Sequence, residues 1–268
     1  MEKIKLTLIL GDCVKVLPTI SSESVDLIIT SPPYNVGKDY QKYSLDDLPK
    51  EEYQKLLETV IKESYRILKI GGRLAINVPN VIMSKKGIIF LSPLVHNICL
   101  ENKFIPREFI IWDKGIIPAY GTAWGSYKSP SCPYLRNCSE AILVYSKVDM
   151  KLHHKGQTDL REDEWLKWTR NIWHFNPTKI DGHPTPFPEE LPKRLIKLYS
   201  FIGDTILDPF LGSGTTMKVA RDLRRSCIGI EINPNYIEIT KKRLNWGSSL
   251  SDNIEWEFKD MSDLNEIN

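Results

Sequence analysis

Four consecutive residues of unusual chemistry, Ser31-Pro32-Pro33-Tyr34, follow an apolar run at residues 25–29. Proline has no N–H and a fixed φ, so the two prolines end a strand and hold the turn after it rigid. The Ser31 hydroxyl, the Pro32 carbonyl and the Tyr34 ring then converge at the carboxyl end of a strand, where open α/β sheets bind ligands. Two acceptors beside an aromatic face suit a flat amine such as the exocyclic amino group of a nucleobase. The alternative is a plain rigid turn.

A second stretch whose residue types suit ligand binding, residues 207–216, combines a short strand, a glycine-rich turn and the start of a helix. Gly212 and Gly214 let the backbone approach a ligand closely, and a helix that starts near Thr215 supplies unpaired N–H groups. No lysine follows the last glycine, which excludes a Walker loop, and the dinucleotide fingerprint needs a third spaced glycine. The next predicted strand ends in Glu231, where a carboxylate commonly binds ribose hydroxyls. The pattern predicts a site for an adenosine-bearing ligand without a polyphosphate.

Together the two stretches resemble the motifs of the DNA amino-methyltransferases, an Asp/Asn/Ser-Pro-Pro-Tyr/Phe catalytic motif and a Phe-x-Gly-x-Gly loop for S-adenosylmethionine. The catalytic motif comes first here, at residues 31–34, and the cofactor loop comes last, at residues 210–214. This order is similar to that of the β group of the family. Residues 69–76 and 183–188 resemble further family segments, so the likeness covers nearly the whole chain. It implies a Rossmann-like S-adenosylmethionine-dependent methyltransferase of a restriction-modification system that acts on double-stranded DNA. It also implies a cognate restriction endonuclease that acts on the same site as a possible partner, and a homodimer as a possible assembly.

The resemblance assigns catalysis to Ser31, Pro32, Pro33 and Tyr34. An exocyclic amine is a poor nucleophile because its lone pair is delocalised into the ring. If Ser31 and the Pro32 carbonyl accept its hydrogens, the nitrogen becomes pyramidal and the lone pair is available for attack. Tyr34 would stack on the base after it is flipped out of the duplex.

The resemblance also implies a set of cofactor-binding residues, which lie at strand ends or in the glycine-rich turn. Asp208 would bind the methionine amino group, Glu231 the ribose, and Asp12 the adenine amine. Thr215 could bind the carboxylate, although as a residue at a helix start it also has a structural explanation. The full set is Asp12, Asp208, Phe210, Gly212, Gly214, Thr215 and Glu231.

The residues expected to contact DNA are polar, basic or aromatic: Asn35, Lys38, Trp124, Lys128, Arg136, Lys167 and Arg170. Aromatic residues interleaved with lysines and arginines suit contact with phosphates and stacking on nucleobases. Asn35 is also expected to orient the catalytic turn. For Trp165 and Trp168 the stronger alternative is that they form the core of a small inserted subdomain, and acidic residues nearby offset the basic ones.

Serine at position 31 resembles the cytosine-amino group of the family, whereas aspartate is usual among adenine enzymes. We therefore expect transfer to cytosine N4, with adenine N6 as the alternative. An RNA methyltransferase and a non-catalytic nucleic-acid-binding relative are further alternatives. Methylation of cytosine carbon needs a Pro-Cys nucleophile, whereas Cys132 and Cys138 follow Ser and Asn.

The chain has 268 residues, of which 41% are hydrophobic, enough for one large domain with an insertion. Its net charge of +2 does not by itself indicate nucleic acid. Its five cysteines have no Cys-x-x-Cys spacing. This favours reduced thiols over disulfides or a zinc site, so we expect no metal. No apolar run reaches the ~18 residues of a membrane span and no signal peptide is evident, so we expect a soluble, cytoplasmic protein.

Strands that alternate with helices predict an α/β fold with a doubly wound, mostly parallel sheet. We expect strands at 5–10, 25–30, 73–78, 104–112, 141–146, 205–208 and 227–231. We expect helices at 14–20, 51–68, 89–101, 191–201, from about 215, and at 235–246. Gly71-Gly72 would end the helix at 51–68, and the strands at 104–112 and 141–146 would form an antiparallel edge. Residues 1–146 would form the catalytic half with a loop insertion at 114–138, residues 147–177 a target-recognition insertion, and residues 178–268 the cofactor-binding half.

Overall fold

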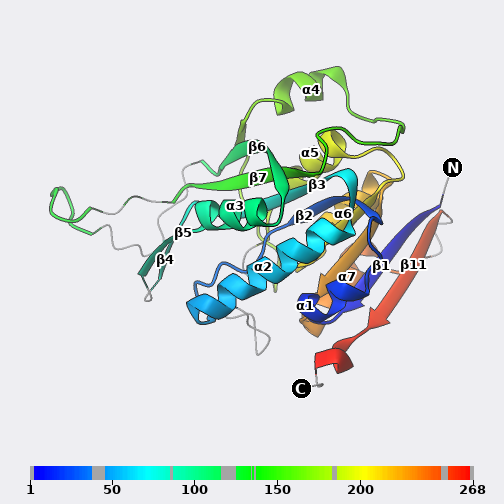
Figure 1. The fold of residues 1–268 in the computed structure, drawn as a ribbon, viewed down its shortest axis with the longest axis horizontal. Helices are drawn as coiled ribbons and strands as arrows, with labels where there is room; N and C mark the ends of the chain where they lie inside the picture. Colours follow the sequence, from blue (N-terminus) through cyan, green and yellow to red (C-terminus); the bar gives the residue numbers. More distant parts are fainter. Residues whose placement is uncertain are drawn as a thin grey trace.

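A nine-stranded sheet runs through the molecule in the order β11-β1-β10-β9-β2-β3-β7-β6-β8 (Figure 1). The computed structural model describes residues 3–37, 46–84, 87–115, 125–133, 135, 137–182, 186–248 and 253–265. The strands are β1 (Ile4–Leu10), β2 (Val25–Thr30), β3 (Leu68–Pro79), β6 (Phe104–Asp113), β7 (Ser139–Lys147), β8 (Ile172–His174), β9 (Thr205–Asp208), β10 (Ser226–Glu231) and β11 (Ile254–Asp260). Neighbours from β11 to β3 pair in parallel, β7 is antiparallel to β3 and β6, and β8 is parallel to β6. The predicted doubly wound, mostly parallel sheet is confirmed.

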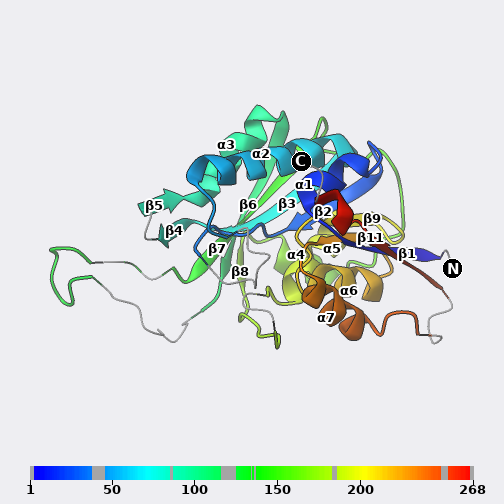
Figure 2. The same ribbon diagram turned by 90° about the horizontal axis from the view of Figure 1, so that it is seen from below.

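Helices cover both faces of this sheet, as Figure 2 shows from below. One face carries α1 (Cys13–Val16), α2 (Lys50–Ile67) and α3 (Leu91–Glu101). The other carries α4 (Glu162–Trp168), α5 (Glu190–Tyr199), α6 (Thr215–Asp222) and α7 (Pro234–Leu244). Short 3₁₀ turns lie at Leu17–Thr19 and Ser262–Asn265, and β4 (Val81–Ser84) pairs with β5 (Gly87–Phe90) in a separate hairpin.

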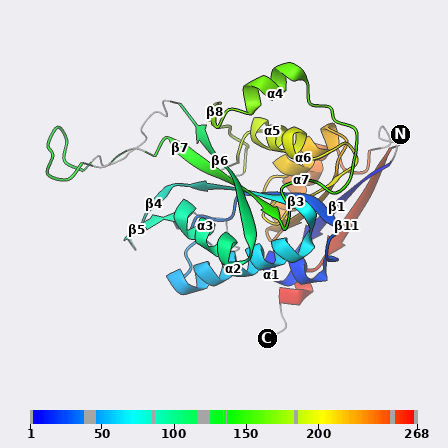
Figure 3. The same ribbon diagram turned by 45° about the horizontal axis from the view of Figure 1, so that its top comes forward.

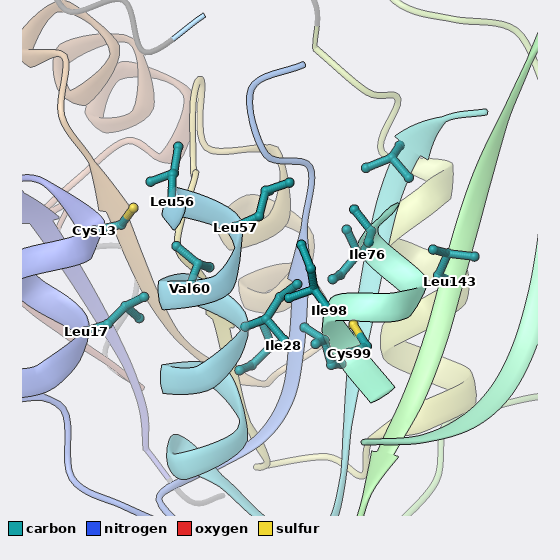
Figure 4. Close-up of a cluster of buried hydrophobic side chains, with 14 of the residues drawn as sticks. Cys13, Leu17, Ile28, Leu56, Leu57, Val60, Ile76, Ile98, Cys99 and Leu143 are labelled. Carbon is teal, nitrogen blue, oxygen red and sulfur yellow. The ribbon is translucent and has the colours of Figure 1, made fainter. Parts of the chain in front are cut away.

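The central strand β2 explains why two apolar cores form. Successive side chains of a strand point to opposite faces. Ile28 therefore packs in the core under α2 and α3, where Figure 4 shows it beside Val60, while Leu27 and Ile29 pack in the core under α5 and α6. Each fully buried side chain of this size contributes about 1.5–3 kcal/mol to folding. The strand is thereby fixed from both sides, and so is the turn that follows it.

The boundary between α2 and β3 corrects one prediction. The helix ends at Ile67 and β3 begins at the next residue, so Gly71 and Gly72 lie inside the strand and do not cap the helix. Gly71 has a φ of +75°, and a Cβ there would lie 1.9 Å from the Lys151 carbonyl oxygen. The glycine is required because the segment after β7 approaches the backbone of β3 closely at this point.

Both edges of the sheet differ from the predictions. The antiparallel pair β6–β7 is confirmed, but β6 is not the edge, because β8 pairs with it through Ile111 and Ile172. At the other edge β11, which was not predicted, pairs in parallel with β1.

The helix predicted at 89–101 is α3, and it begins at Leu91, because the preceding residues form β5.

Residues 147–177 supply both α4 and β8. Figure 3 shows α4 over α5, and the Lys197 Nζ on α5 forms an ion pair with Glu164 on α4. Within the 114–138 stretch, an isolated bridge joins Gly125 to Pro133 in a segment drawn away from the sheet in Figure 1. The predicted division into catalytic, recognition and cofactor-binding parts stays a prediction.

Candidate active site

The carboxyl ends of β1, β2, β9 and β10 open onto one pocket. Its empty volume, which includes open solvent, is about 940 Å³. Residues from both sequence motifs line it. Those predicted for catalysis or cofactor binding that line the pocket are Asp12, Ser31, Pro32, Pro33, Tyr34, Phe210, Gly212, Thr215 and Glu231. The structure therefore brings together two motifs that are far apart in the chain.

Glu231 ends β10 at the floor of this pocket. Its side chain accepts hydrogen bonds from the backbone N–H groups of Gly212 (2.7 Å) and Asn233 (2.8 Å). The residue is only 8% exposed. Burial raises the pKa of the Glu231 carboxyl to about 7, although the two N–H groups oppose the shift. Its charge is therefore sensitive to any further hydrogen-bond donor that enters the pocket.

Asp208 lies behind the glycine-rich turn and does not line the pocket. It accepts hydrogen bonds from the Thr216 hydroxyl (2.6 Å) and the Phe210 N–H (3.1 Å), and burial raises its pKa to about 6. In this structure Asp208 joins the turn to the first residues of α6. Binding of the methionine amino group by Asp208, which the resemblance implied, stays a prediction.

Gly214 also lies outside the pocket lining, for a packing reason. It precedes α6 with a φ of +80°, and a Cβ there would lie 2.6 Å from the Thr240 Cγ2 on α7. The glycine allows α6 and α7 to approach each other. Gly212, with a φ of +56°, is the glycine that faces the pocket.

The catalytic turn is held by hydrogen bonds from the strands and from α2. The Ser31 Oγ lies 2.7 Å from the Tyr34 hydroxyl oxygen and donates to the Asn77 carbonyl at 3.1 Å. The Tyr53 hydroxyl on α2 donates to the Pro33 carbonyl at 2.8 Å. The turn thus presents Ser31 and Tyr34 to the pocket from a fixed backbone.

Three residues that the sequence did not single out form a hydrogen-bonded network that ends at the Tyr34 hydroxyl. This hydroxyl donates to Glu140 Oε2 at 3.2 Å, and the Asn77 Nδ2 lies 2.5 Å from the same oxygen and 3.2 Å from the Tyr34 oxygen. Lys114 forms an ion pair with Glu140 Oε1. The available signal was weak: Asn77 is a polar residue within an apolar strand, and Glu140 is an acid just before one.

Asn35 is buried, with a φ of +58°. Its Nδ2 donates to the Leu48 carbonyl (2.9 Å), its Oδ1 accepts from the Leu48 N–H (2.6 Å), and its N–H donates to the Asp46 carboxylate (2.7 Å). These contacts support the expectation that Asn35 orients the turn. The side chain is thereby bound to the protein's own loop, and a contact of Asn35 with DNA stays a prediction.

Of the other residues expected to contact DNA, Lys128, Lys167 and Arg170 are described, and none of the three lines the pocket. Lys167 and Arg170 are exposed on α4 and just after it. Lys128 is exposed, with its Nζ 5.4 Å from the centre of the Tyr127 ring. Lys38, Trp124 and Arg136 fall outside the described residues. Contact with DNA stays a prediction for all of these residues.

The tryptophans of α4 divide between core and surface. Trp168 is 5% exposed and lies under the Arg194 guanidinium, whose carbon is 5.6 Å from the ring centre. Trp173 on β8 contacts the same guanidinium at 5.2 Å. Trp165 is 53% exposed. Trp168 is therefore buried against α5, whereas Trp165 lies on the surface, and a separate subdomain core stays a prediction.

Among the described residues, a cluster of side chains of the types that bind metal ions lies at the amino ends of β2 and β9, away from the pocket. Atoms of Asp26, His154 and Asp204 lie within 4.8 Å of one another. Lys69 already forms an ion pair with Asp26 at 2.8 Å, and His154 Nε2 lies 2.8 Å from Asp204 Oδ1. These contacts hold the segment around His154 against the sheet.

A doubly wound sheet with a glycine-rich turn, an acid-ended strand and a Ser-Pro-Pro-Tyr turn at one pocket defines the class of S-adenosylmethionine-dependent amino-methyltransferases. The model of the N6/N4 DNA methylase family matches residues 25–242, and the chain belongs to that family. It is a DNA methyltransferase of the restriction-modification type, with S-adenosylmethionine as cofactor. No helix among the described residues has the length and hydrophobicity that crossing a membrane requires.

Relatives match along most of the chain. The type II methyltransferase M.MjaI of Methanocaldococcus jannaschii is 30% identical, over 88% of this chain and 90% of its own. M.HpaI of Haemophilus parainfluenzae is 31% identical, over 96% and 81%. A putative DNA modification methylase of Thermus thermophilus, solved with S-adenosyl-L-methionine, is 28% identical, with a TM-score of 0.70 over 94% of this chain and 99% of that one. The cytosine-N4-specific PvuII DNA methyltransferase shares the fold, with a TM-score of 0.70 at 20% identity over 90% of this chain and 89% of its own.

Proposed function

We propose that this enzyme methylates the exocyclic N4 amine of cytosine within a short duplex recognition sequence. The observation that carries the proposal is the neutral Ser31 hydroxyl at the pocket, at the position where adenine enzymes of the family usually have aspartate. A hydroxyl is a weaker acceptor than a carboxylate. The more acidic cytosine amine needs less help to give up its hydrogens, so a hydroxyl is sufficient for it.

In this proposal the catalytic turn acts on the amine and needs no strong base before the transfer. The Ser31 Oγ and the Pro32 carbonyl accept the two N–H groups, so the nitrogen becomes pyramidal and its lone pair points across the pocket. The Tyr34 ring stacks on the flipped base and fixes its angle of approach. S-adenosylmethionine, when bound, supplies an electrophilic methyl group. Because both motifs face one pocket, proximity and orientation supply most of the acceleration.

The pocket residues fit an adenosine-bearing cofactor. Glu231 is a buried acceptor beside Gly212, which suits the two ribose hydroxyls. Phe210 offers an aromatic surface, and Asp12, which follows β1, adds a second carboxylate to the lining. We assign Thr215 to the carboxylate of the cofactor. Asp208 would support the loop from behind or bind the methionine amine after a local shift.

We further propose that residues 147–177 read the target sequence. Trp165 and Lys167 are exposed on α4 and Arg170 just after it, while Trp168 and Glu164 attach the helix to α5. Aromatic and basic side chains on one exposed helix suit contact with a phosphate backbone. Lys128, in the loop insertion at 114–138, would add a further contact with DNA. A cognate restriction endonuclease and a homodimer stay predictions.

The test is to incubate the protein with methyl-labelled S-adenosylmethionine and duplex DNA from a host without modification, then digest the DNA and separate the nucleosides. We expect N4-methylcytosine, in duplex DNA and not in RNA. N6-methyladenine as the sole product would overturn the assignment of the base and leave the enzyme class intact. Label in RNA alone would overturn the assignment of DNA. Reactions without protein provide the blank, and sequencing of the methylated sites gives the recognition sequence.

A further inference from the structure

Glu140 is a buried carboxylate one hydroxyl group away from the catalytic serine. It lies near the start of β7 and is 6% exposed. Its two oxygens are bound by three side chains, Lys114, Asn77 and Tyr34. Burying a carboxylate is costly unless it is paired and hydrogen-bonded. Lys114 and Asn77 already meet that need, so the contact with Tyr34 calls for another explanation.

The charge on Glu140 sets the direction of the hydrogen bonds around it. An ionised carboxylate only accepts, so the Tyr34 hydroxyl and the Asn77 amide both donate to it. The Asn77 Oδ1 meanwhile finds no partner within the described part of the chain, although it is buried. The orientation of this amide therefore follows the carboxylate and not the needs of its own oxygen.

The same direction passes on to Ser31. With its single proton donated to Glu140, the Tyr34 oxygen offers only lone pairs to Ser31, 2.7 Å away, and is one of two acceptors for the Ser31 proton. The other acceptor for the Ser31 proton is the Asn77 carbonyl at 3.1 Å, which also belongs to the protein interior. In either case the proton of Ser31 points inward, and its oxygen presents lone pairs to the pocket.

We propose that Glu140 is a positioning residue for methyl transfer. Through Tyr34 it fixes the Ser31 hydroxyl as an acceptor, and it receives the proton that the amine loses. This inference rests on the proposed amine methylation, whether of cytosine or of adenine.

The step balances as follows in atoms and charge. The amine nitrogen takes the methyl group as the methyl–sulfur bond breaks with its electron pair left on sulfur. One amine proton moves to the Ser31 Oγ, the Ser31 proton moves to the Tyr34 oxygen, and the Tyr34 proton moves to Glu140. The resulting carboxylic acid returns its proton to water after the product leaves.

The decisive experiment measures single-turnover methyl transfer with DNA and cofactor prebound, in H₂O and in D₂O. The variants are Glu140→Gln, Tyr34→Phe and the double variant. Tyr34→Phe keeps the ring for stacking and removes the hydroxyl that links Ser31 to Glu140. Glu108→Gln, an exposed glutamate on the neighbouring strand β6, is the matched control.

We expect each single variant to lower the single-turnover rate about 100-fold, the lower end for general acid–base assistance. The double variant should be no more than about threefold slower than either, because both changes cut one path. The solvent isotope effect of the parent should disappear in Tyr34→Phe, and cofactor affinity should change less than threefold. A merely structural role for Glu140 would leave the isotope effect in place.

Three results separate the inference from its premise. If the parent methylates no amine, the proposed function fails. If the parent is active and both single variants keep their rates within threefold, Glu140 has no part in the step and the inference is overturned. If Glu140→Gln binds cofactor poorly or unfolds early, Tyr34→Phe decides alone, and its unchanged rate and isotope effect would overturn the proposal.

Discussion

The two sides of the pocket are built by different means. On the cofactor side, Glu231 is held by backbone N–H groups from the turn and from the residues just after β10. On the catalytic side, the Tyr34 hydroxyl is held by the side chains of Asn77 and Glu140 from two other strands, and Glu140 is in turn paired with Lys114. Backbone donors are fixed by the fold itself and survive changes of neighbouring side chains. The cofactor side should therefore tolerate substitution around it, whereas the catalytic side should fail when one remote residue changes.

The largest effect that separates the two sides should come from Ser31→Ala. Loss of an acceptor that matters mainly as the amine becomes pyramidal should lower the single-turnover rate by about 10²–10³-fold, as for other hydrogen bonds made in a transition state. Cofactor affinity, measured by calorimetry, should stay within twofold. Ser21→Ala, on the surface before β2, is the control. A parental rate in Ser31→Ala would reduce this residue to a turn former.

The next effect belongs to the cofactor side. Glu231→Ala should weaken S-adenosylmethionine binding by about 1–3 kcal/mol, the value for a hydrogen bond to a charged group together with the donors left unpaired. The rate at saturating cofactor should change much less. Glu255→Ala, an exposed glutamate on β11, should leave affinity unchanged. Equal affinities for the parent and Glu231→Ala would remove this carboxylate from the cofactor site.

The pH dependence of cofactor binding sharpens the same assignment. The pKa of Glu231 is raised to about 7 by burial. Ribose hydroxyls donate to the ionised form, so binding favours loss of the proton, and affinity should fall as the pH drops below about 7. We expect about a tenfold loss between pH 8 and pH 6, since a group is mostly protonated one unit below its pKa. Titration calorimetry should show proton release on binding at pH 7, and Glu231→Gln should show neither effect.

The smallest effect lies outside both sides of the pocket. Replacing Lys167 and Arg170 with Ala should weaken DNA binding and reduce the salt slope by about 0.9 for each lost phosphate contact. Cofactor affinity should not change. The matched control replaces Lys55 and Lys62, two exposed lysines of α2 on the opposite face of the sheet. If the two double variants have the same salt slope, α4 does not contact the phosphate backbone.

Much of the cofactor side follows from local sequence. The bounds of β2 and β9 match the predicted strands, because each is an apolar run that ends at a proline turn. Glu231 was found because it ends an apolar strand. Asp208 was placed at the pocket for the same reason, but the strand also turns its side chain toward Thr216, which sequence position does not show.

The catalytic network could not be predicted in the same way. Tyr34, Asn77, Glu140 and Lys114 meet because β2, β3, β7 and β6 are neighbours in that order. No spacing along the chain encodes this order. Gly71 was misassigned for the same reason. Its position after an amphipathic helix matches a C-cap, but glycine is required there because the backbone of Lys151, remote in the sequence, lies close to it.

The edge strand β11 has a consequence for how this protein behaves at high concentration. A parallel edge strand presents unpaired backbone groups on which another chain can add a strand. In β11, Glu255 and Glu257 form ion pairs with Lys5 on β1, and Glu257 forms another with Lys259. An incoming apolar strand would have to bury these charges beside its own backbone. The alternation of acids with aromatic residues in β11 therefore acts against edge-to-edge aggregation while it still closes the core beneath.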